Sequence, residues 1–276
     1  MKKRNDSKIT MAALMMMAAM AMTSCASSKK INGDSNASKD SEMGKNEEDL
    51  DNSYLVLSDT QQDIVKKNNA FALRLFNKVT DMESKVISPM SVSYLMGMLA
   101  NGADGITQQE ILKAIGCEGV SVSDLNELYK AMLLTANKQD KQTTVNIANY
   151  IAVNKNFQLN KDFCQKVSDS YLAGIESLDF TSSKSTDRIN GWCKEKTNGM
   201  IPRIIDQVSA DAVSYLMNAI YFKGTWQNKF NAKDTKLENF RGYTRDIQKV
   251  EMMHQVKKLF YAENKDFKAV DLPYGN

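Results

Sequence analysis

The sequence is poor in the residues from which metal and redox sites are built. Its 276 residues include three prolines and a single histidine, His254, which nearly excludes a zinc site made of several imidazoles. Its cysteines are Cys25, Cys117, Cys164 and Cys193. They lie far apart and form no C-x-x-C pair, so neither a thioredoxin-type pair nor a zinc ribbon is supported. The last three are most simply small buried apolar residues, with one disulfide and an odd thiol as the open alternative.

Motifs that carry common enzyme chemistry are also absent. The sequence contains no G-x-x-x-x-G-K-[ST] loop and no G-x-G-x-x-G turn, so a nucleotide cofactor has no support. No G-x-S-x-G elbow is present to expose a nucleophilic serine. His254 lies near Lys257 and Lys258 in what resembles a solvated strand end, so we do not expect it to act as a general base. The residues alone therefore predict no enzyme activity, no cofactor and no metal site.

An excess of one charge is absent from most of the chain. The formal net charge is +3 at pH 7, and residues 1–24 already carry this excess, so the remainder is neutral overall. A nucleic-acid partner would require a basic excess in the folded part, so we expect no nucleic-acid binding. The chain is 42% apolar and 25% charged, which is typical of a globular protein with a sizeable core.

The N-terminus has the pattern of a targeting segment. Residues 1–8 are basic, residues 9–22 are apolar with a bias to small side chains, and Cys25 follows at once. This order predicts a secretory signal over residues 1–24, whose apolar part is short for a membrane-spanning helix. A cysteine after small residues also resembles a bacterial lipobox, in which Cys25 would become the lipidated first residue. The alternative is an ordinary signal peptide with an incidental cysteine.

The next segment, residues 25–57, is polar and has almost no apolar periodicity. Such a stretch cannot bury enough surface to offset its ordering entropy, so we interpret it as a flexible tether before a folded domain over residues 58–276. A lipidated Cys25 would then hold this domain off a bacterial cell envelope. With an ordinary signal peptide, the protein would instead be secreted to the extracellular space.

The folded part has helical spacing in its first half and mostly strand patterns in its second. Helices are expected at 59–80, 90–100, 107–116, 122–137, 159–171 and 186–197. Strands are expected at 86–89, 145–153, 175–180 and 213–222. Thr107 and Glu110 have capping-box spacing, which predicts where one helix begins. The nearly unbroken apolar run around Asn218 indicates a central strand buried on both faces. The predicted class is α+β.

Several short motifs follow one another in the order of a known family. Residues 69–76 read NAFALRLF, 87–92 read ISPMSV, and 99–111 read LANGADGITQQEI. Residues 189–201 contain INGW and TNGMI, 217–226 read MNAIYFKGTW, and VEMM and DLPY follow at 250–253 and 271–274. From about residue 60 to the end, this ordered set resembles the serpin family of serine protease inhibitors. One such motif is a weak signal, whereas the ordered set is specific.

The resemblance implies a fold in which N-terminal helices pack on a large central sheet. It also implies inhibition of serine or cysteine proteases by an exposed loop, which is cleaved as bait and then inserts into that sheet. Ser88, Ser91 and Asn218 fall where the family has a polar network beneath the sheet, at the place that opens. Trp226 falls where a tryptophan packs at the upper end of the sheet. We expect all four residues to support the structure and not to touch the protease.

The chain departs from the family pattern at its C-terminus, where it stops at Asn276. The family's hinge, reactive loop and last strands would follow, as would the histidine of the polar network, whose place His254 does not occupy. We therefore expect a partial or truncated sequence, the N-terminal two-thirds of a serpin domain. The expected function is protease inhibition by the serpin mechanism. The alternatives are a non-inhibitory binding or structural protein of the same fold, or an inactive truncated remnant.

Overall fold

The computed structural model describes residues 55–81, 85–136 and 142–275. The predicted signal segment, Cys25 and nearly all of the predicted tether lie outside the described residues. The helices are α2 (Asp59–Val79), α3 (Pro89–Asn101), α4 (Gly105–Ala114), α5 (Val122–Ala136), α6 (Lys161–Tyr171) and α7 (Ser183–Lys196). The strands are β1 (Thr143–Asn154), β2 (Gly174–Leu178), β3 (Ser214–Gly224), β4 (Lys236–Arg241), β5 (Ile247–Met252), β6 (Tyr261–Glu263) and β7 (Lys268–Val270), with a 3-10 turn, η1 (Ala232–Asp234), before β4. The α+β class is confirmed.

The helices form where the apolar spacing predicted them, and their first residues follow local capping chemistry. Ser88 caps α3 with its side chain, and Pro89 follows in the first turn, where its missing N–H is not needed. The strand predicted at 86–89 is wrong, because this segment pairs with no described strand and serves instead as the lead into α3. The predicted start of α4 at Thr107 is also wrong. Asp104 caps that helix through the amide of Gly105, which places Thr107 inside it.

A three-stranded sheet in the order β2-β1-β3 separates two layers of helices. Strand β2 is parallel to β1, and β3 is antiparallel to β1, with Asn149 opposite Asn218. The expectation that β3 is a central strand buried on both faces is wrong for the described sheet, where β3 lies at an edge. Strand β1 takes the central place, and its residues 149–154 are all buried.

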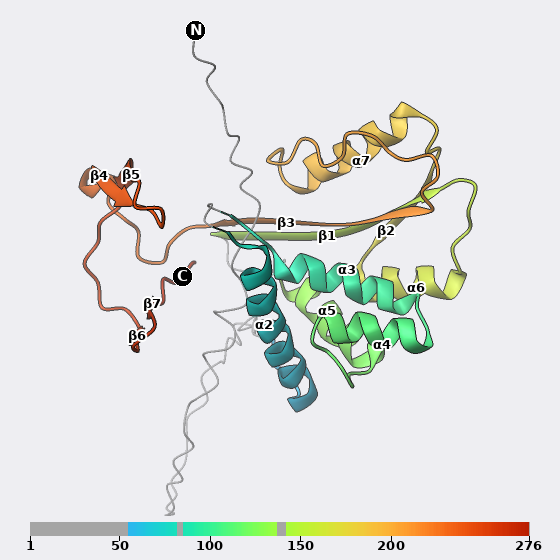
Figure 1. The fold of residues 1–276 in the computed structure, drawn as a ribbon, viewed down its shortest axis with the longest axis horizontal. Helices are drawn as coiled ribbons and strands as arrows, with labels where there is room; N and C mark the ends of the chain where they lie inside the picture. The colour runs from blue at the N-terminus through green and yellow to red at the C-terminus, as the bar shows by residue number, and fades with distance from the viewer. Residues whose placement is uncertain (1–54, 82–84, 137–141, 276) are drawn as a thin grey trace, which may run out of the picture.

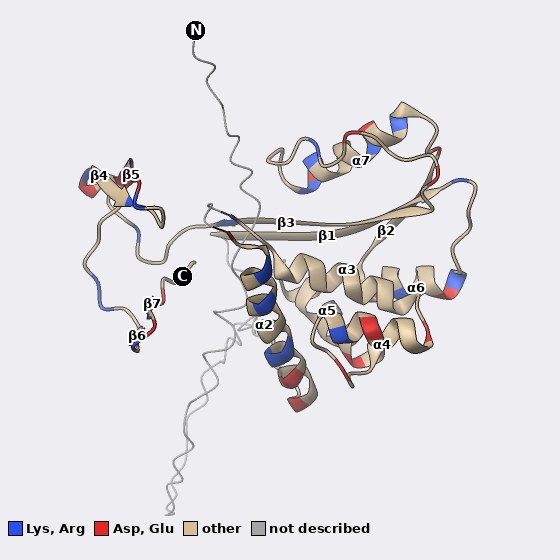
Figure 2. Ribbon diagram, in the orientation of Figure 1, with Lys and Arg blue, Asp and Glu red and all other residues tan. Residues whose placement is uncertain are grey.

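Helices α2 to α6 lie on one side of the sheet and α7 on the other (Figure 1). Because side chains alternate along a strand, β1 contributes to a hydrophobic core on each face. Ile151 packs with the helical core of α2, α3, α5 and α6, while Tyr150 packs with Ile189 and Trp192 of α7. Charged residues are interspersed over the helices, and β1 and β3 are almost free of them (Figure 2).

The chain after β3 leaves the sheet and forms two short antiparallel hairpins, β4-β5 and β6-β7. Apolar side chains of this part are largely exposed, since Leu237 of β4 is 63% exposed and Val256, between the hairpins, is 98% exposed. The end of the chain returns to the sheet, where Tyr274 forms a bridge with Trp226. None of the described helices is long and apolar enough to span a membrane.

Candidate functional site

The first part of the candidate site is the start of α3 beneath the sheet. Ser88 has an extended backbone, and its Oγ accepts a hydrogen bond from the Ser91 amide at 3.3 Å. The Ser91 hydroxyl lies 2.9 Å from the same Oγ. Both serines are half-buried. Their hydroxyls hydrogen-bond to each other, and Ser88 Oγ also accepts from a main-chain amide in the first turn of the helix, which has no partner within the helix. The family resemblance assigned both serines to one polar network, and in the structure their hydroxyls are in direct contact.

The second part is an asparagine pair across β1 and β3. Asn218 Nδ2 donates to Asn149 Oδ1 at 2.8 Å and lies 3.4 Å from the Ala148 carbonyl. Asn149 Nδ2 in turn donates to the carbonyl of Tyr171 at 2.7 Å. Asn218 Oδ1 is buried and has no partner among the described residues. An unsatisfied buried acceptor costs about 1–3 kcal/mol, so a hydrogen-bond donor placed beside this oxygen would stabilise the asparagine pair.

The two parts lie on packed elements, since α3 contacts β3. No described hydrogen bond joins Asn218 to Ser88 or Ser91, however, so the shared polar network implied by the family resemblance stays a prediction. Asn149 is a residue of this site that the sequence motifs do not identify. Its signal was an asparagine in an apolar strand, the same signal that identified Asn218, but only the strand register shows that the two are opposite each other.

The third part lies at the C-terminal end of β3, where aromatic residues contact the returning end of the chain. Trp226 stacks on Tyr274 with ring centroids 4.2 Å apart and an interplanar angle of 15°, and Phe222 packs edge-on against Tyr274. The amide of Gln227 donates to the Pro273 carbonyl at 2.9 Å. Gly224 must lack a side chain here, because a Cβ atom would lie 2.6 Å from the ring of Tyr274. Trp226 therefore connects the sheet to the C-terminal strands.

A fourth group of side chains fastens α7 to the other face of the sheet. Arg188 on α7 contacts Glu176 on β2 through Nε at 3.1 Å and through a terminal nitrogen at 2.8 Å. The Tyr150 hydroxyl donates to the same carboxylate at 2.7 Å, and its ring stacks on Trp192. Burial opposes ionisation of Glu176, but the hydrogen bonds from Tyr150 and Arg188 and the positive charge outweigh it, so the pKa of Glu176 is lowered.

The remaining sequence candidates lie apart from these groups. Cys117, Cys164 and Cys193 are free thiols in the structure, and burial raises the pKa of Cys117 to about 11. Of the two alternatives for these three cysteines, the structure thus has free thiols and no disulfide between them. His254 is half-exposed, with Nε2 3.1 Å from a Glu238 oxygen on the β4-β5 hairpin. Within residues 55–81, 85–136 and 142–275, no group of acidic, histidine or cysteine side chains has the arrangement of a metal site.

Comparison with known proteins gives a consistent result. The sequence profile described as "Serpin (serine protease inhibitor)" matches residues 66–276. Leukocyte elastase inhibitor from Bos taurus is 33% identical over 216 residues, covering 75% of this chain and 56% of the bovine protein. Serine protease inhibitor 42Dd from Drosophila melanogaster is 30% identical over 208 residues, covering 74% of this chain and 56% of the fly protein.

The fold is similar to that of solved serpins. The native-state crystal structure of tengpin, a thermophilic serpin, has a TM-score of 0.71 at 31% identity, covering 80% of this chain and 56% of that chain. Tengpin in its latent state also has a TM-score of 0.71, with 59% of that chain covered. The present chain thus spans a little over half the length of the relatives that it matches.

Proposed function

The chain belongs to the serpin family, and from this membership we propose that the whole protein inhibits serine proteases by trapping them during cleavage of a bait loop. The observation that carries the proposal is the match to the family over residues 66–276, together with relatives named as protease inhibitors. In this proposal the protein is a substrate-like trap and not a catalyst. Its partner is a serine protease or, through the same acyl-enzyme chemistry, a cysteine protease.

The geometry of β3 supports this mechanism. One edge of β3 pairs with β1, and no described strand pairs with the other edge. A strand added there would gain main-chain hydrogen bonds, and the orphan Oδ1 of Asn218 lies in the strand that would receive it. We further propose that Ser88 and Ser91 support the sheet from below and that Trp226 holds its upper end. In this assignment the four residues act on sheet opening without touching the protease.

The test is to mix the whole protein with trypsin-like, chymotrypsin-like and elastase-like proteases and with a papain-like enzyme. Trapping predicts a complex that survives SDS, with a mass equal to the protease plus the cleaved inhibitor, and loss of protease activity in step with it. The matched control is the same protease with its nucleophile replaced by alanine, which should form no such complex. Cleavage without any stable complex across the panel would contradict the proposal and favour a non-inhibitory binding protein or an inactive remnant.

We also propose that the protein is exported and attached to a bacterial cell envelope through lipid on Cys25. The support is the order of basic, apolar and small residues before that cysteine. Acyl chains anchor through burial of CH₂ groups at about 0.8 kcal/mol each, so several chains on one residue hold a protein firmly.

The anchor is tested by fractionating cells that express the full chain. The Cys25→Ala protein should move from the membrane to the soluble fraction, whereas Cys164→Ala, which removes a half-buried thiol of the folded part, should stay with the membrane. Identical fractionation of Cys25→Ala and the unaltered protein would contradict the lipid anchor. The family assignment would be unaffected by that result.

A further inference from the structure

Tyr171 connects the helical layer to the sheet through its two ends. It is the last residue of α6, and Leu172 after it has a left-handed backbone with φ of 51°. This cap directs the Tyr171 carbonyl to β1, where it accepts from Asn149 Nδ2 at 2.7 Å. The side chain extends the other way into the helical core, where it is fully buried. One residue thus touches both β1, whose Asn149 binds Asn218 of β3, and the helices beneath.

The hydroxyl end of Tyr171 meets a pair of asparagines on α3 and α5. It donates to Asn126 Oδ1 at 2.7 Å. Asn126 and Asn101 exchange reciprocal amide hydrogen bonds at 2.9 Å, and Asn101 Nδ2 also donates to the Gly97 carbonyl at 2.8 Å. The oxygen and nitrogen of both side-chain amides are therefore engaged, which fixes their orientation. Both asparagines are half-buried, so this end of the connection reaches the surface.

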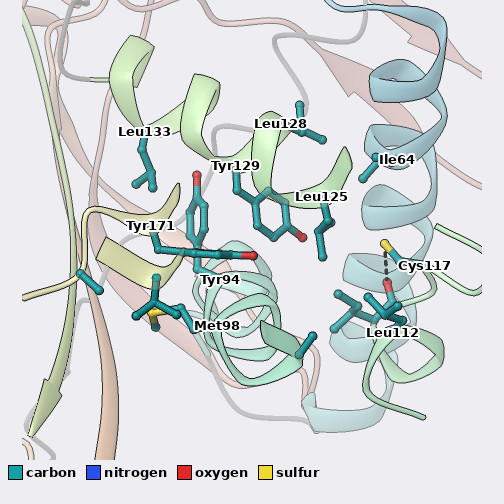
Figure 3. Close-up of a cluster of buried hydrophobic side chains, with 14 of the residues drawn as sticks. Ile64, Tyr94, Met98, Leu112, Cys117, Leu125, Leu128, Tyr129, Leu133 and Tyr171 are labelled. Atoms are coloured by element: carbon teal, nitrogen blue, oxygen red, sulfur yellow. Dashed lines mark hydrogen bonds between the residues drawn. The ribbon is translucent and has the colours of Figure 1, made fainter. Parts of the chain in front are cut away.

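The packing around Tyr171 leaves the ring no freedom to turn away. Tyr94 and Tyr129 meet it edge-on, at centroid distances of 6.5 and 6.0 Å (Figure 3). Gly97 makes room for the hydroxyl, because a Cβ atom at that position would lie 2.4 Å from it. Tyr171 is held by hydrogen bonds at its carbonyl and at its hydroxyl. Because a close-packed interior deforms little, a shift of the hydroxyl end should move the carbonyl end as well.

We propose that Tyr171 is a positioning residue through which Asn101 and Asn126, on the helical surface, set the orientation of Asn149 and hence of Asn218 at the β3 edge. The continuous chain of hydrogen bonds from α3 and α5 to β3 carries this inference. Its consequence is that a change at Asn126, in the helical layer across the core, alters the local opening of β1 from β3. This inference rests on the proposed function in one respect, which is that β3 is taken as the strand beside which the bait loop inserts.

The test compares two Tyr→Phe variants within the same aromatic cluster. Tyr171→Phe removes the hydroxyl that reaches Asn126. Tyr94→Phe removes a hydroxyl that is equally buried and has no hydrogen-bond partner among the described residues. Amide hydrogen exchange of the full chain is measured at residues 216–220 of β3, with residues 64–71 of α2 as the internal reference. Tyr171→Phe should accelerate exchange in β3 about two- to tenfold relative to α2, which is the range expected for one lost hydrogen bond, and Tyr94→Phe should not.

Asn126→Ala breaks the same hydrogen bond from its half-exposed side and keeps the test open if Tyr171→Phe does not fold. Because it also removes the two hydrogen bonds between Asn126 and Asn101, it should accelerate exchange in β3 at least as much as Tyr171→Phe does. Adding Tyr171→Phe to it should add little, because the hydrogen bond between Tyr171 and Asn126 is already absent. Equal exchange in the two Tyr→Phe variants, equal acceleration of α2 and β3, or independent effects in the double variant would each overturn the proposal. No protease enters this experiment, so its failure leaves protease inhibition untouched, and a failed inhibition assay leaves the connection untouched.

Discussion

At the scale of single residues, the helical core depends on positions where a side chain is missing. Gly97 lies inside α3, where glycine lowers helix stability, yet the Tyr171 hydroxyl occupies the volume that a methyl group would need. Gly191 is also inside a helix, but no other atom lies near the place of its missing Cβ. Both glycines lie inside helices, but only Gly97 is required by the packing around it.

This difference gives a paired prediction. Gly97→Ala should lower the free energy of unfolding by about 1–3 kcal/mol, because the new methyl group overlaps a rigid, buried ring. Gly191→Ala should raise it by about 0.5–1 kcal/mol, because only the helix propensity changes. Urea denaturation of both variants measures the two values. Stabilisation by both substitutions would mean that Tyr171 does not occupy the space beside Gly97.

At the scale of elements, the end of α6 is defined by a residue with unusual backbone geometry. Leu172 adopts a left-handed conformation although it is neither glycine nor asparagine, and its side chain is about half-exposed. A left-handed backbone costs about 1–2 kcal/mol for a residue with a Cβ atom. The hydrogen bond from Asn149 to the Tyr171 carbonyl offsets part of this cost. The same turn redirects the chain into β2, which begins two residues later.

The backbone effect at this helix end can be separated from side-chain packing. At position 172, Leu172→Gly should be about 1 kcal/mol more stable than Leu172→Ala, since both remove the same packing and only glycine relieves the strain. At exposed Lys166 within α6, the order should reverse, with Lys166→Ala more stable than Lys166→Gly by about 1 kcal/mol. Thermal melts of the four variants provide the comparison. The same order at both positions would contradict the left-handed cap.

A second element-scale prediction concerns the attachment of α7 at acid pH. The pKa of Glu176 is lower in the folded state than its ordinary value of 4.5. A depressed pKa contributes stability above the unfolded-state value, and that stability is lost as the pH falls through the folded-state value. The Glu176 side chain is 36% exposed, so we expect the contribution to be discounted by solvent to about 0.5–1 kcal/mol.

The measurement is the free energy of unfolding between about pH 6 and pH 3. Glu176→Gln should start lower at pH 6 and lose less stability on acidification than the unaltered protein, because it has no carboxylate to protonate. Glu110→Gln, at an exposed position of α4, should follow the unaltered protein across the range. Parallel curves for all three proteins would show that the contacts of Glu176 with Arg188 and Tyr150 contribute nothing to stability.

At the scale of the whole molecule, the described chain divides into a packed body and a loosely held C-terminal part. The body has a core on each face of the sheet, and both cores use β1. The part after β3 exposes most of its apolar side chains and returns to the body through Trp226 and Tyr274. The stacked pair and its neighbouring main-chain hydrogen bonds join the C-terminal part to the end of β3, so we expect them to limit local opening there.

Limited proteolysis tests this connection. Lys223 and Lys229 are exposed and flank Trp226, and the main-chain pairing between them restrains cleavage by trypsin. Tyr274→Ala should raise the rate of cleavage at these sites roughly tenfold, because stacking and bridging are lost together. Tyr243→Ala removes a tyrosine that is 79% exposed and should leave the rate unchanged. Equal rates in both variants would contradict a clamp at Tyr274.

Local patterns were sufficient for most of the elements and insufficient for their partners. The helix expected at 59–80 is α2, and the one expected at 122–137 is α5, because apolar spacing and caps are encoded within one segment. The strand at 86–89 was predicted from composition and fails because a strand needs a partner. The predicted central position of residues 213–222 is wrong for the same reason, because the apolar content of a strand does not reveal which strands pair with it.

The helices, the α+β class and the family can be predicted without a structure, because each depends on the order and spacing of residues along the chain. The pairing of Asn218 with Asn149, the link from this pair through Tyr171 to Asn126, and the stacking of Trp226 on Tyr274 depend on how the chain folds in three dimensions. These contacts join residues tens of positions apart. Strand register, the left-handed turn at Leu172 and close packing around Gly97 create them, and none of these can be deduced from local periodicity.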